Sequence, residues 1–172
     1  MVDLYGLAQE LHTAAVEKGF WDVDDALEKH VAKMHSELGE VIQADRAGIM
    51  YEVERDGAKP EGVVAELADF TMMTLDYIIH VMETDAEKLL NMNVEIDDMS
   101  ADIPTYTIVN ILHAALANIT CVKRRENILQ DIMMSMHIPI TWCSLHGYDL
   151  IDVIRAKMDY NRSRPRLHGR AY

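Results

Sequence analysis

The 172-residue chain is long enough for one sizeable hydrophobic core and too short for more than one or two domains. Its composition is that of an ordinary globular protein, with 49% hydrophobic and 26% charged residues. The net charge of −13 argues against a general nucleic-acid binder, because contacts to phosphates require lysine and arginine.

Secretion and membrane insertion are not expected. The N-terminus lacks a basic segment followed by an apolar run, and no stretch approaches the roughly 18 uninterrupted apolar residues of a membrane span. Cys121 and Cys143 each lie in an apolar helical pattern, which favours buried free thiols over a disulfide. These features predict a soluble cytoplasmic protein that does not bind membranes.

Hydrophobic patterns with a period of 3.6 residues dominate the chain, and no convincing alternating strand is found, so an all-α helical bundle is predicted. The first helix is expected from about Asp3 to Lys18, with Gly19 ending it. The second helix begins near Asp24, which can cap it, and fades near Gly48. Residues 49–59 are expected to form a loop or a short helical excursion.

The remaining helices follow from proline, glycine and capping signals. Pro60 is expected to open a helix over residues 61–81, at a first-turn position that proline tolerates. Thr84, followed three residues later by Glu87, forms a capping-box pattern that starts a short helix ending near Asn93. Residues 94–104 form a connection. Later helices are predicted at about 105–125, 127–145 and 149–161, with a kink at Pro139 and a break at Gly147.

A faint internal repeat relates the two halves of the chain. Residues 35–42 align with residues 113–120, and residues 66–69 align with residues 128–131, at matching apolar positions. Three of the four acidic residues discussed next are absent from the second half. A duplication with antiparallel helix pairs is one interpretation. Chance similarity between amphipathic helix pairs is the other.

Two acidic pairs stand out, Glu37-x-x-Glu40 and Glu66-x-x-Asp69. Each helical residue turns by about 100°, so both carboxylates of a pair lie beside the apolar stripe of their helix, about 60° apart. If the two helices pack antiparallel through these stripes, four carboxylates converge. Such carboxylates repel one another unless a cation neutralises them, and oxygen ligands favour Mg²⁺ or Mn²⁺ over zinc. A solvated acidic face on each helix is the alternative.

Other residues could complete such a site. Asp76 lies two turns beyond Asp69 and could orient a ligand without binding the metal, and Lys33 shares the helix face of Glu37 and Glu40. Di-iron carboxylate bundles use Glu-x-x-His motifs. No glutamate of this chain is followed by histidine three residues later, so oxygen-activating chemistry is disfavoured.

The end of the chain is basic. Six cationic residues lie between Arg155 and Tyr172, against the single acid Asp159. An acidic body with one basic tail suits a small polyphosphate ligand, which needs both a metal cage and a cationic clamp. For the last few residues, a solvated and frayed terminus is the alternative.

Three segments together resemble the MazG-like all-α nucleoside triphosphate pyrophosphohydrolases. They are the two acidic pairs with their flanking residues, the terminal Lys157-x-x-x-Asn161 segment with its basic tail, and the N-terminal stretch from His12 to Trp21. The pieces cover about half of the chain. Residues 94–140 are extra relative to the shortest members of the family, and the arginine usually found a turn after the second acidic pair is not evident.

The resemblance implies hydrolysis of a nucleoside triphosphate to the monophosphate and pyrophosphate, with Mg²⁺, or Mn²⁺ as a substitute, as the cofactor. The metal ligands would be Glu37, Glu40, Glu66 and Asp69, and Glu37 or Glu40 would take the proton of the attacking water. The implied substrate-binding residues are Lys157, Asn161, Arg164, Trp21, Lys33 and His12. Trp21 could stack on a base or cap a core edge, and His12 could equally be a structural histidine.

The expected organisation is a single MazG-like all-α domain over residues 1–172. Residues 1–93 would hold the catalytic helix pairs, residues 105–161 a degenerate second copy that completes the bundle, and residues 162–172 the basic tail. The family also implies a homodimer that acts on a (deoxy)nucleotide in sanitation of the nucleotide pool. The alternative function is a non-catalytic helical module for nucleotide binding or protein interaction.

Overall fold

The computed structural model describes residues 3–22, 26–53, 58–82, 85–92, 99–120 and 128–169. This part of the chain is all-α, as predicted. Its α-helices are α1 (Leu4–Glu17), α2 (Ala26–Ala47), α3 (Val63–Met82), α4 (Ala86–Leu90), α5 (Thr105–Thr120), α6 (Ile128–Leu145) and α7 (Leu150–Arg162), and they are followed by the 3₁₀ turn η3 (Arg166–Gly169). None of the described helices combines the length and the apolar character that crossing a membrane requires.

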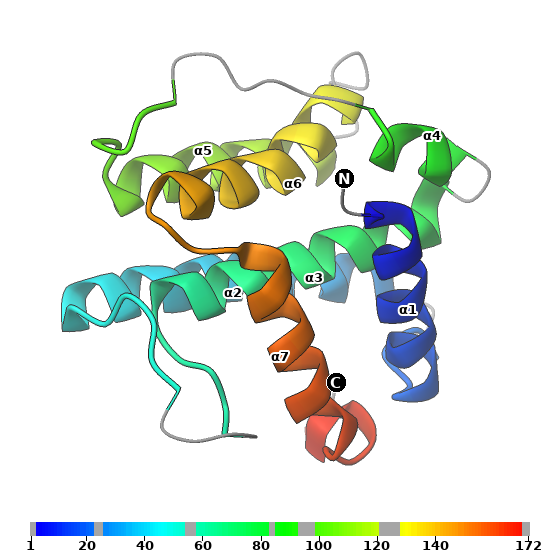
Figure 1. Ribbon diagram of the computed structural model, residues 1–172. Coiled ribbons are helices and arrows are strands. Elements are labelled where there is room, and N and C mark those ends of the chain that lie inside the picture. Colours follow the sequence, from blue (N-terminus) through cyan, green and yellow to red (C-terminus); the bar gives the residue numbers. More distant parts are fainter. Residues whose placement is uncertain are drawn as a thin grey trace.

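Two antiparallel helix pairs form two layers (Figure 1). Helices α2 and α3 make the lower pair, α5 and α6 make the upper pair, and α1 and α7 cross beside α3. Helix α3 is the centre of the fold, because thirteen of its twenty residues are buried and it packs against α1, α2, α6 and α7. The polar side chains of Glu66, Thr71, Thr74 and Asp76 on α3 therefore lie inside the protein.

Several predicted helix ends are confirmed. The Asp3 carboxylate accepts a hydrogen bond from the backbone amide of Gly6 at 2.8 Å and so caps α1, which ends before Gly19 at φ +80°. Asp149 caps α7 in the same way, and Gly147, at φ +83°, separates α6 from α7. Helix α6 continues through Pro139. The predicted caps Asp24 and Thr84 lie outside the described residues, as does Cys121.

The prediction that Pro60 opens the third helix is wrong. The chain is still extended there, because Glu52 and Glu61 exchange two backbone hydrogen bonds of 3.0 and 2.9 Å in an isolated antiparallel bridge. Helix α3 begins only at Val63. Pro60 therefore does not start the helix, because the backbone hydrogen bonds between Glu52 and Glu61 keep the chain extended at this point.

The loop before α3 also caps that helix. The amides of Val63 and Val64 donate hydrogen bonds of 3.0 Å to the carbonyls of Ile49 and Met50. Gly62 allows this close approach, because a Cβ there would lie 2.8 Å from the Met50 carbonyl oxygen, and its φ of +102° favours glycine. The first amides of α3 are thus satisfied by backbone.

The two layers meet through a pair of histidines. The Nδ1 atoms of His35 on α2 and His113 on α5 lie 2.8 Å apart, and the two rings are within 9° of parallel. These residues are equivalent in the internal repeat, and contact between equivalent residues is what a pseudo-two-fold axis produces. The contact favours the predicted duplication, which stays a prediction.

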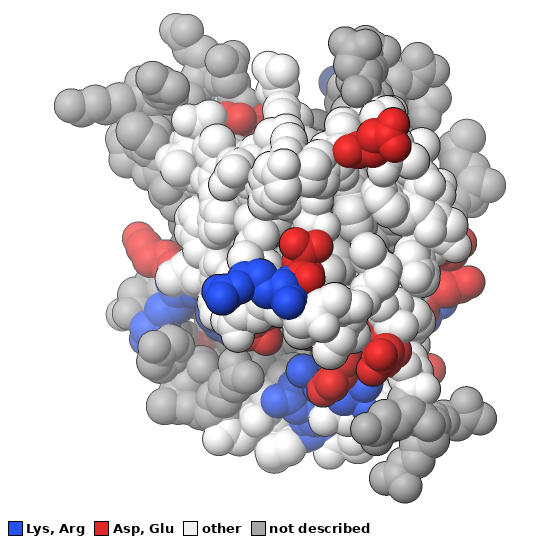
Figure 2. Space-filling view, turned by 90° about the vertical axis from the view of Figure 1, so that its left-hand side faces the viewer, with Lys and Arg blue, Asp and Glu red and all other residues white. Residues whose placement is uncertain are grey.

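Charged side chains are mixed on the surface that Figure 2 shows. In its upper part, which α5 and α6 form in Figure 1, the described residues are mostly uncharged. In its lower part, acidic and basic side chains lie side by side. On this face, the described basic residues do not form the continuous patch that a nucleic-acid backbone requires.

Candidate functional site

A cavity of about 320 Å³ lies between α1, α2, α3, α7 and the residues that follow α7. This volume is within the usual range for small-molecule sites, on the order of 300–1,000 Å³. Its lining has an acidic group, a cationic group and an apolar group. The acidic lining residues are Glu17, Glu37, Glu40, Asp69 and Asp76, and the cationic ones are Lys18, Lys33, Lys59, Arg162 and Arg164.

Three of the four predicted metal ligands come together, and two of them, Glu37 and Glu40, line this cavity. Glu37 and Glu40 on α2, and Glu66 on α3, each offer one carboxylate oxygen, and these oxygens all lie within 4.8 Å of one another. Glu66 is only 6% exposed, and its Oε2 has no hydrogen-bond partner. A buried carboxylate beside two more carboxylates fits a hard divalent cation such as Mg²⁺.

Asp69, the fourth predicted ligand, lies next to this group. Its Oδ2 forms an ion pair with the ammonium group of Lys157. That ammonium group also lies 3.6 Å from Glu66 Oε2, and the Lys157 side chain is 2% exposed. Lys157, predicted to bind phosphate, therefore acts in this structure as a buried counterion of the acidic cluster.

The carboxyl group of Glu37 has a strongly raised pKa. Burial, together with the neighbouring charges of Asp69, Glu40 and Glu66, raises its pKa to about 7. The carboxyl group is therefore partly protonated near neutral pH when no cation is bound. A divalent cation would favour the charged form of Glu37.

Because Glu37 is partly protonated near neutral pH, the stabilisation of the protein by Mg²⁺ should depend on pH. Because the pKa of Glu37 is raised on folding, the carboxyl group stabilises the metal-free protein at acidic pH, and this contribution is lost as pH rises through about 7. Mg²⁺ needs the deprotonated form. We expect Mg²⁺ to raise the melting temperature clearly at pH 8 and little at pH 5.5, in thermal melts monitored by fluorescence.

Two variants on the same helix test this expectation. Glu37→Gln should reduce the Mg²⁺-dependent shift at pH 8, whereas Glu28→Gln, which changes an exposed side chain, should keep it. An equal Mg²⁺ shift at both pH values, or an undiminished shift in Glu37→Gln, would count against this metal site.

The opposite end of the cavity is built around Asp76, which is 5% exposed. Its Oδ1 accepts hydrogen bonds from His12 Nδ1 at 2.7 Å and from Trp21 Nε1 at 3.1 Å. Burial raises the pKa of Asp76 to about 6, while the hydrogen bonds from His12 and Trp21 oppose the rise. His12 and Trp21, both predicted to bind substrate, are thus held together by one buried acid.

Trp21 does not line the cavity, although its neighbour Phe20 does. The Trp21 ring is already stacked on His80, with ring centroids 3.7 Å apart, and lies 4.8 Å from the ring of His30. The Lys33 ammonium group lies 4.3 Å from the centroid of the Phe20 ring. Phe20 was missed from the sequence, although an aromatic residue directly after the helix-ending Gly19 was a usable signal.

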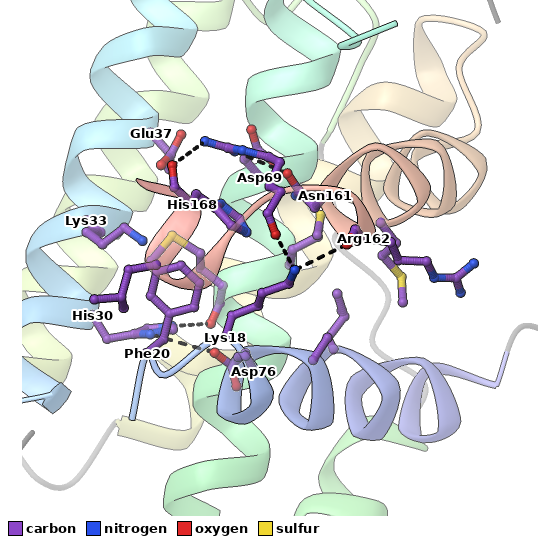
Figure 3. Close-up of a pocket in the computed structure, with 18 of the residues that line it drawn as sticks. Lys18, Phe20, His30, Lys33, Glu37, Asp69, Asp76, Asn161, Arg162 and His168 are labelled. Atoms are coloured by element: carbon purple, nitrogen blue, oxygen red, sulfur yellow. Dashed lines mark hydrogen bonds and ion pairs between the residues drawn. The ribbon is translucent and has the colours of Figure 1, made fainter. Parts of the chain in front are cut away.

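His30 is fixed in one tautomer. Its Nε2 lies 2.8 Å from the carbonyl oxygen of Met73, which can only accept, so the proton is on Nε2. Its Nδ1 faces Asp76 Oδ2 at 3.7 Å (Figure 3). Burial lowers the pKa of His30 to about 4.

This lowered pKa predicts a loss of stability in acid. A histidine whose pKa falls on folding stabilises the protein above its unfolded pKa of about 6.5, and this contribution is lost as pH falls towards 4. Glutamine at position 30 can still donate to Met73 but does not titrate. The free energy of unfolding can be measured in urea at pH 7 and at pH 4. Between these two pH values, it should fall by about 3 kcal/mol more in the wild type than in His30→Gln. Equal losses in the two proteins would contradict the assignment.

The cationic residues of the cavity come from α2, from α7 and from segments between or after the helices. Lys33 and Glu37 project from α2, Asp69 and Asp76 from α3, and Asn161 from α7 towards the same space (Figure 3). The Asn161 Oδ1 atom accepts a hydrogen bond of 3.2 Å from the guanidinium group of Arg164. The predicted residues Lys33, Asn161 and Arg164 therefore all line the cavity that the acidic cluster borders.

Comparison with protein-family models, with curated proteins and with solved structures found no match. The resemblance to the MazG-like enzymes therefore stays a hypothesis. What the site can do must be argued from its own side chains.

Proposed function

We propose that the chain is a Mg²⁺-dependent nucleoside triphosphate pyrophosphohydrolase of MazG-like type, which releases the nucleoside monophosphate and pyrophosphate. One observation carries the proposal. The carboxylate oxygens of Glu37, Glu40 and Glu66 lie within 4.8 Å of one another, beside a cavity with cationic side chains on its walls. A metal-polyphosphate complex needs both features together.

The two ends of the cavity suit the two ends of a nucleotide. Asp69 and Asp76 are seven residues apart on α3, which corresponds to about 10 Å along the helix axis. The acidic cluster at one end would hold the metal-bound phosphates. Phe20 and the buried acid Asp76 at the other end suit a base, which has an aromatic face and polar edges.

The side chains divide the chemistry among them. Glu37, Glu40, Glu66 and Asp69 would hold Mg²⁺, which would supply Lewis-acid activation of a phosphoryl oxygen and lower the pKa of a water molecule. Glu37 or Glu40 would accept the proton of the attacking water. Lys33, Asn161 and Arg164 would bind phosphate oxygens and neutralise the leaving pyrophosphate.

A second candidate is a non-catalytic helical module that binds a nucleotide or a protein. One observation favours it. The ammonium group of Lys157 already neutralises part of the acidic cluster, through Asp69 and Glu66, without any metal. This candidate predicts no hydrolysis and no Mg²⁺-dependent rise in melting temperature.

The deciding experiment is a panel of ribonucleoside and deoxyribonucleoside triphosphates incubated with the protein and Mg²⁺. The products are then separated as monophosphate with pyrophosphate or as diphosphate with phosphate. We expect monophosphate and pyrophosphate in equal amounts from at least one nucleotide, and no turnover in the presence of a chelator. If no nucleotide gives a product, the proposed enzymatic activity is wrong. If the product is the nucleoside diphosphate, the chain cleaves a different phosphoanhydride bond from the one proposed.

We propose that the protein acts in the cytoplasm on nucleotides of the cellular pool, and that it forms a homodimer. The buried free thiol of Cys143 suits a reducing compartment. Tyr106 on α5 and Leu129 on α6 are 59% and 53% exposed, and apolar residues of this kind suit a subunit interface. Sedimentation of Tyr106→Glu against wild type tests the dimer.

A further inference from the structure

The residues after α7 fold back onto the turn after α1. We call residues 163–169 the C-terminal strap and residues 18–22 the α1 turn. The Leu167 amide donates a hydrogen bond of 2.9 Å to the Lys18 carbonyl, and the Lys18 ammonium group donates in return to the carbonyls of Arg162, at 3.2 Å, and Arg164. Lys18 therefore binds the strap through both its backbone and its side chain.

Further contacts hold the strap and the α1 turn together. Arg166 and Asp22 form an ion pair of 2.6 Å, and the rings of Phe20 and His168 meet edge to face at 5.1 Å. The strap lies directly on Gly19, where a Cβ would be only 2.7 Å from Arg166 Nε. A side chain at position 19 would therefore require the Arg166 guanidinium group to move.

The backbone of the strap is held in an unusual conformation. Leu167 and His168 are consecutive non-glycine residues with φ of 49° and 52°. Left-handed backbone at such residues persists only where surrounding contacts over-determine it. The contacts to the α1 turn supply that constraint, so the strap conformation depends on them.

The strap forms part of the cavity wall. Arg164, Leu167 and His168 all line the cavity, next to Lys18 and Phe20 from the α1 turn. Figure 3 shows Lys18, Phe20 and His168 around the same space as Glu37. The position of the Arg164 guanidinium group relative to the acidic cluster is therefore set by how the strap is attached.

We propose that Lys18 is a positioning residue for polyphosphate binding. Its ammonium group binds the carbonyls at the C-terminal end of α7, where a helix leaves carbonyls unpaired and a positive charge is favoured. This holds the strap so that Arg164 and His168 stand at the wall of the cavity, where they contact phosphate oxygens. The inference rests on the proposed function.

The first test removes the ammonium group. In Lys18→Met, hydrogen exchange at the Leu167 amide should be about tenfold faster. The affinity for inorganic tripolyphosphate in the presence of Mg²⁺, measured by calorimetry, should be about tenfold weaker. Tenfold is about the factor that one hydrogen bond to a charged group contributes. Lys18→Arg keeps a cationic donor and should retain most of the exchange protection of Leu167 and most of the affinity for tripolyphosphate. Lys88→Met, at an exposed position on α4, is the matched control and should change neither.

The second test uses the other strap contact. Asp22 touches the strap through Arg166 and is not among the cavity-lining residues. Asp22→Arg should therefore weaken tripolyphosphate binding without losing any group that faces the ligand. Adding Arg166→Asp reverses the ion pair and should recover the affinity.

The outcomes separate the positioning role from other roles. Weaker binding with wild-type protection of Leu167 would mean that Lys18 contacts phosphate directly, and faster exchange with unchanged affinity would mean that the strap does not serve binding. Either result overturns the inference, as does a wild-type protein that fails to bind tripolyphosphate. If binding responds as expected but no nucleotide is hydrolysed, the proposed function fails and the positioning role stands.

Discussion

Glu40→Gln is expected to lower pyrophosphate release by about 10²–10³-fold, the loss seen when one preorganised electrostatic group is removed from an active site. Glutamine has the same shape but removes one negative charge from three carboxylates whose oxygens lie within 4.8 Å. The remaining cluster binds a divalent cation less tightly. The measurement is kcat/KM for the best nucleotide of the panel, with circular dichroism showing unchanged helix content.

The Mg²⁺ dependence adds a sharper criterion. If Glu40 is a metal ligand, the Mg²⁺ concentration for half-maximal rate rises in Glu40→Gln, and high Mg²⁺ recovers part of the activity. Glu28→Gln makes the same chemical change at an exposed position of α2 and should behave as wild type. Full activity of Glu40→Gln at low Mg²⁺ would remove Glu40 from the site.

Lys157→Met is expected to lower the free energy of unfolding of the metal-free protein by about 3–5 kcal/mol, the usual cost of removing one partner of a buried ion pair. The Lys157 side chain is 2% exposed, and its loss removes a buried counterion from Asp69 and leaves Glu66 with Lys59 at 3.9 Å. Urea unfolding in a chelator measures this loss. Mg²⁺ should recover part of the stability, because it supplies the missing positive charge.

A paired substitution separates charge from packing. Asp69→Asn combined with Lys157→Met removes both charges and should recover part of the stability that the single change loses. Lys88→Met, at an exposed site, should cost little. If Lys157→Met left stability unchanged and only raised KM, the residue would be a phosphate ligand, as the sequence alone had predicted.

Local signals predicted the helices well. Asp3 and Asp149 cap α1 and α7, and the apolar stripes that accompany the two acidic pairs pack α2 against α3, as expected from their phase. These features depend on residues three or four positions apart. Pro60 is the exception, because a bridge between Glu52 and Glu61 delays the start of α3.

Contacts between distant residues could not be predicted in this way. The Lys157–Asp69 pair spans 88 residues, and the contact between Trp21 and Asp76 spans 55. No periodicity encodes whether a lysine on the last helix meets carboxylates or a ligand. The sequence thus indicated which residues belong near the site, but it could not show that Lys157 is buried or that Phe20, rather than Trp21, lines the cavity.

The way the chain enters α3 limits how this protein can recognise an anion. In many nucleotide-binding proteins, free amides at a helix start cradle the phosphates. Here, the Val63 and Val64 amides are already bonded to Ile49 and Met50, so that end of the helix adjoining the acidic cluster has little to offer. Under the proposed function, recognition of the polyphosphate would come from Mg²⁺ and from ammonium and guanidinium groups, and raising the ionic strength should weaken binding markedly.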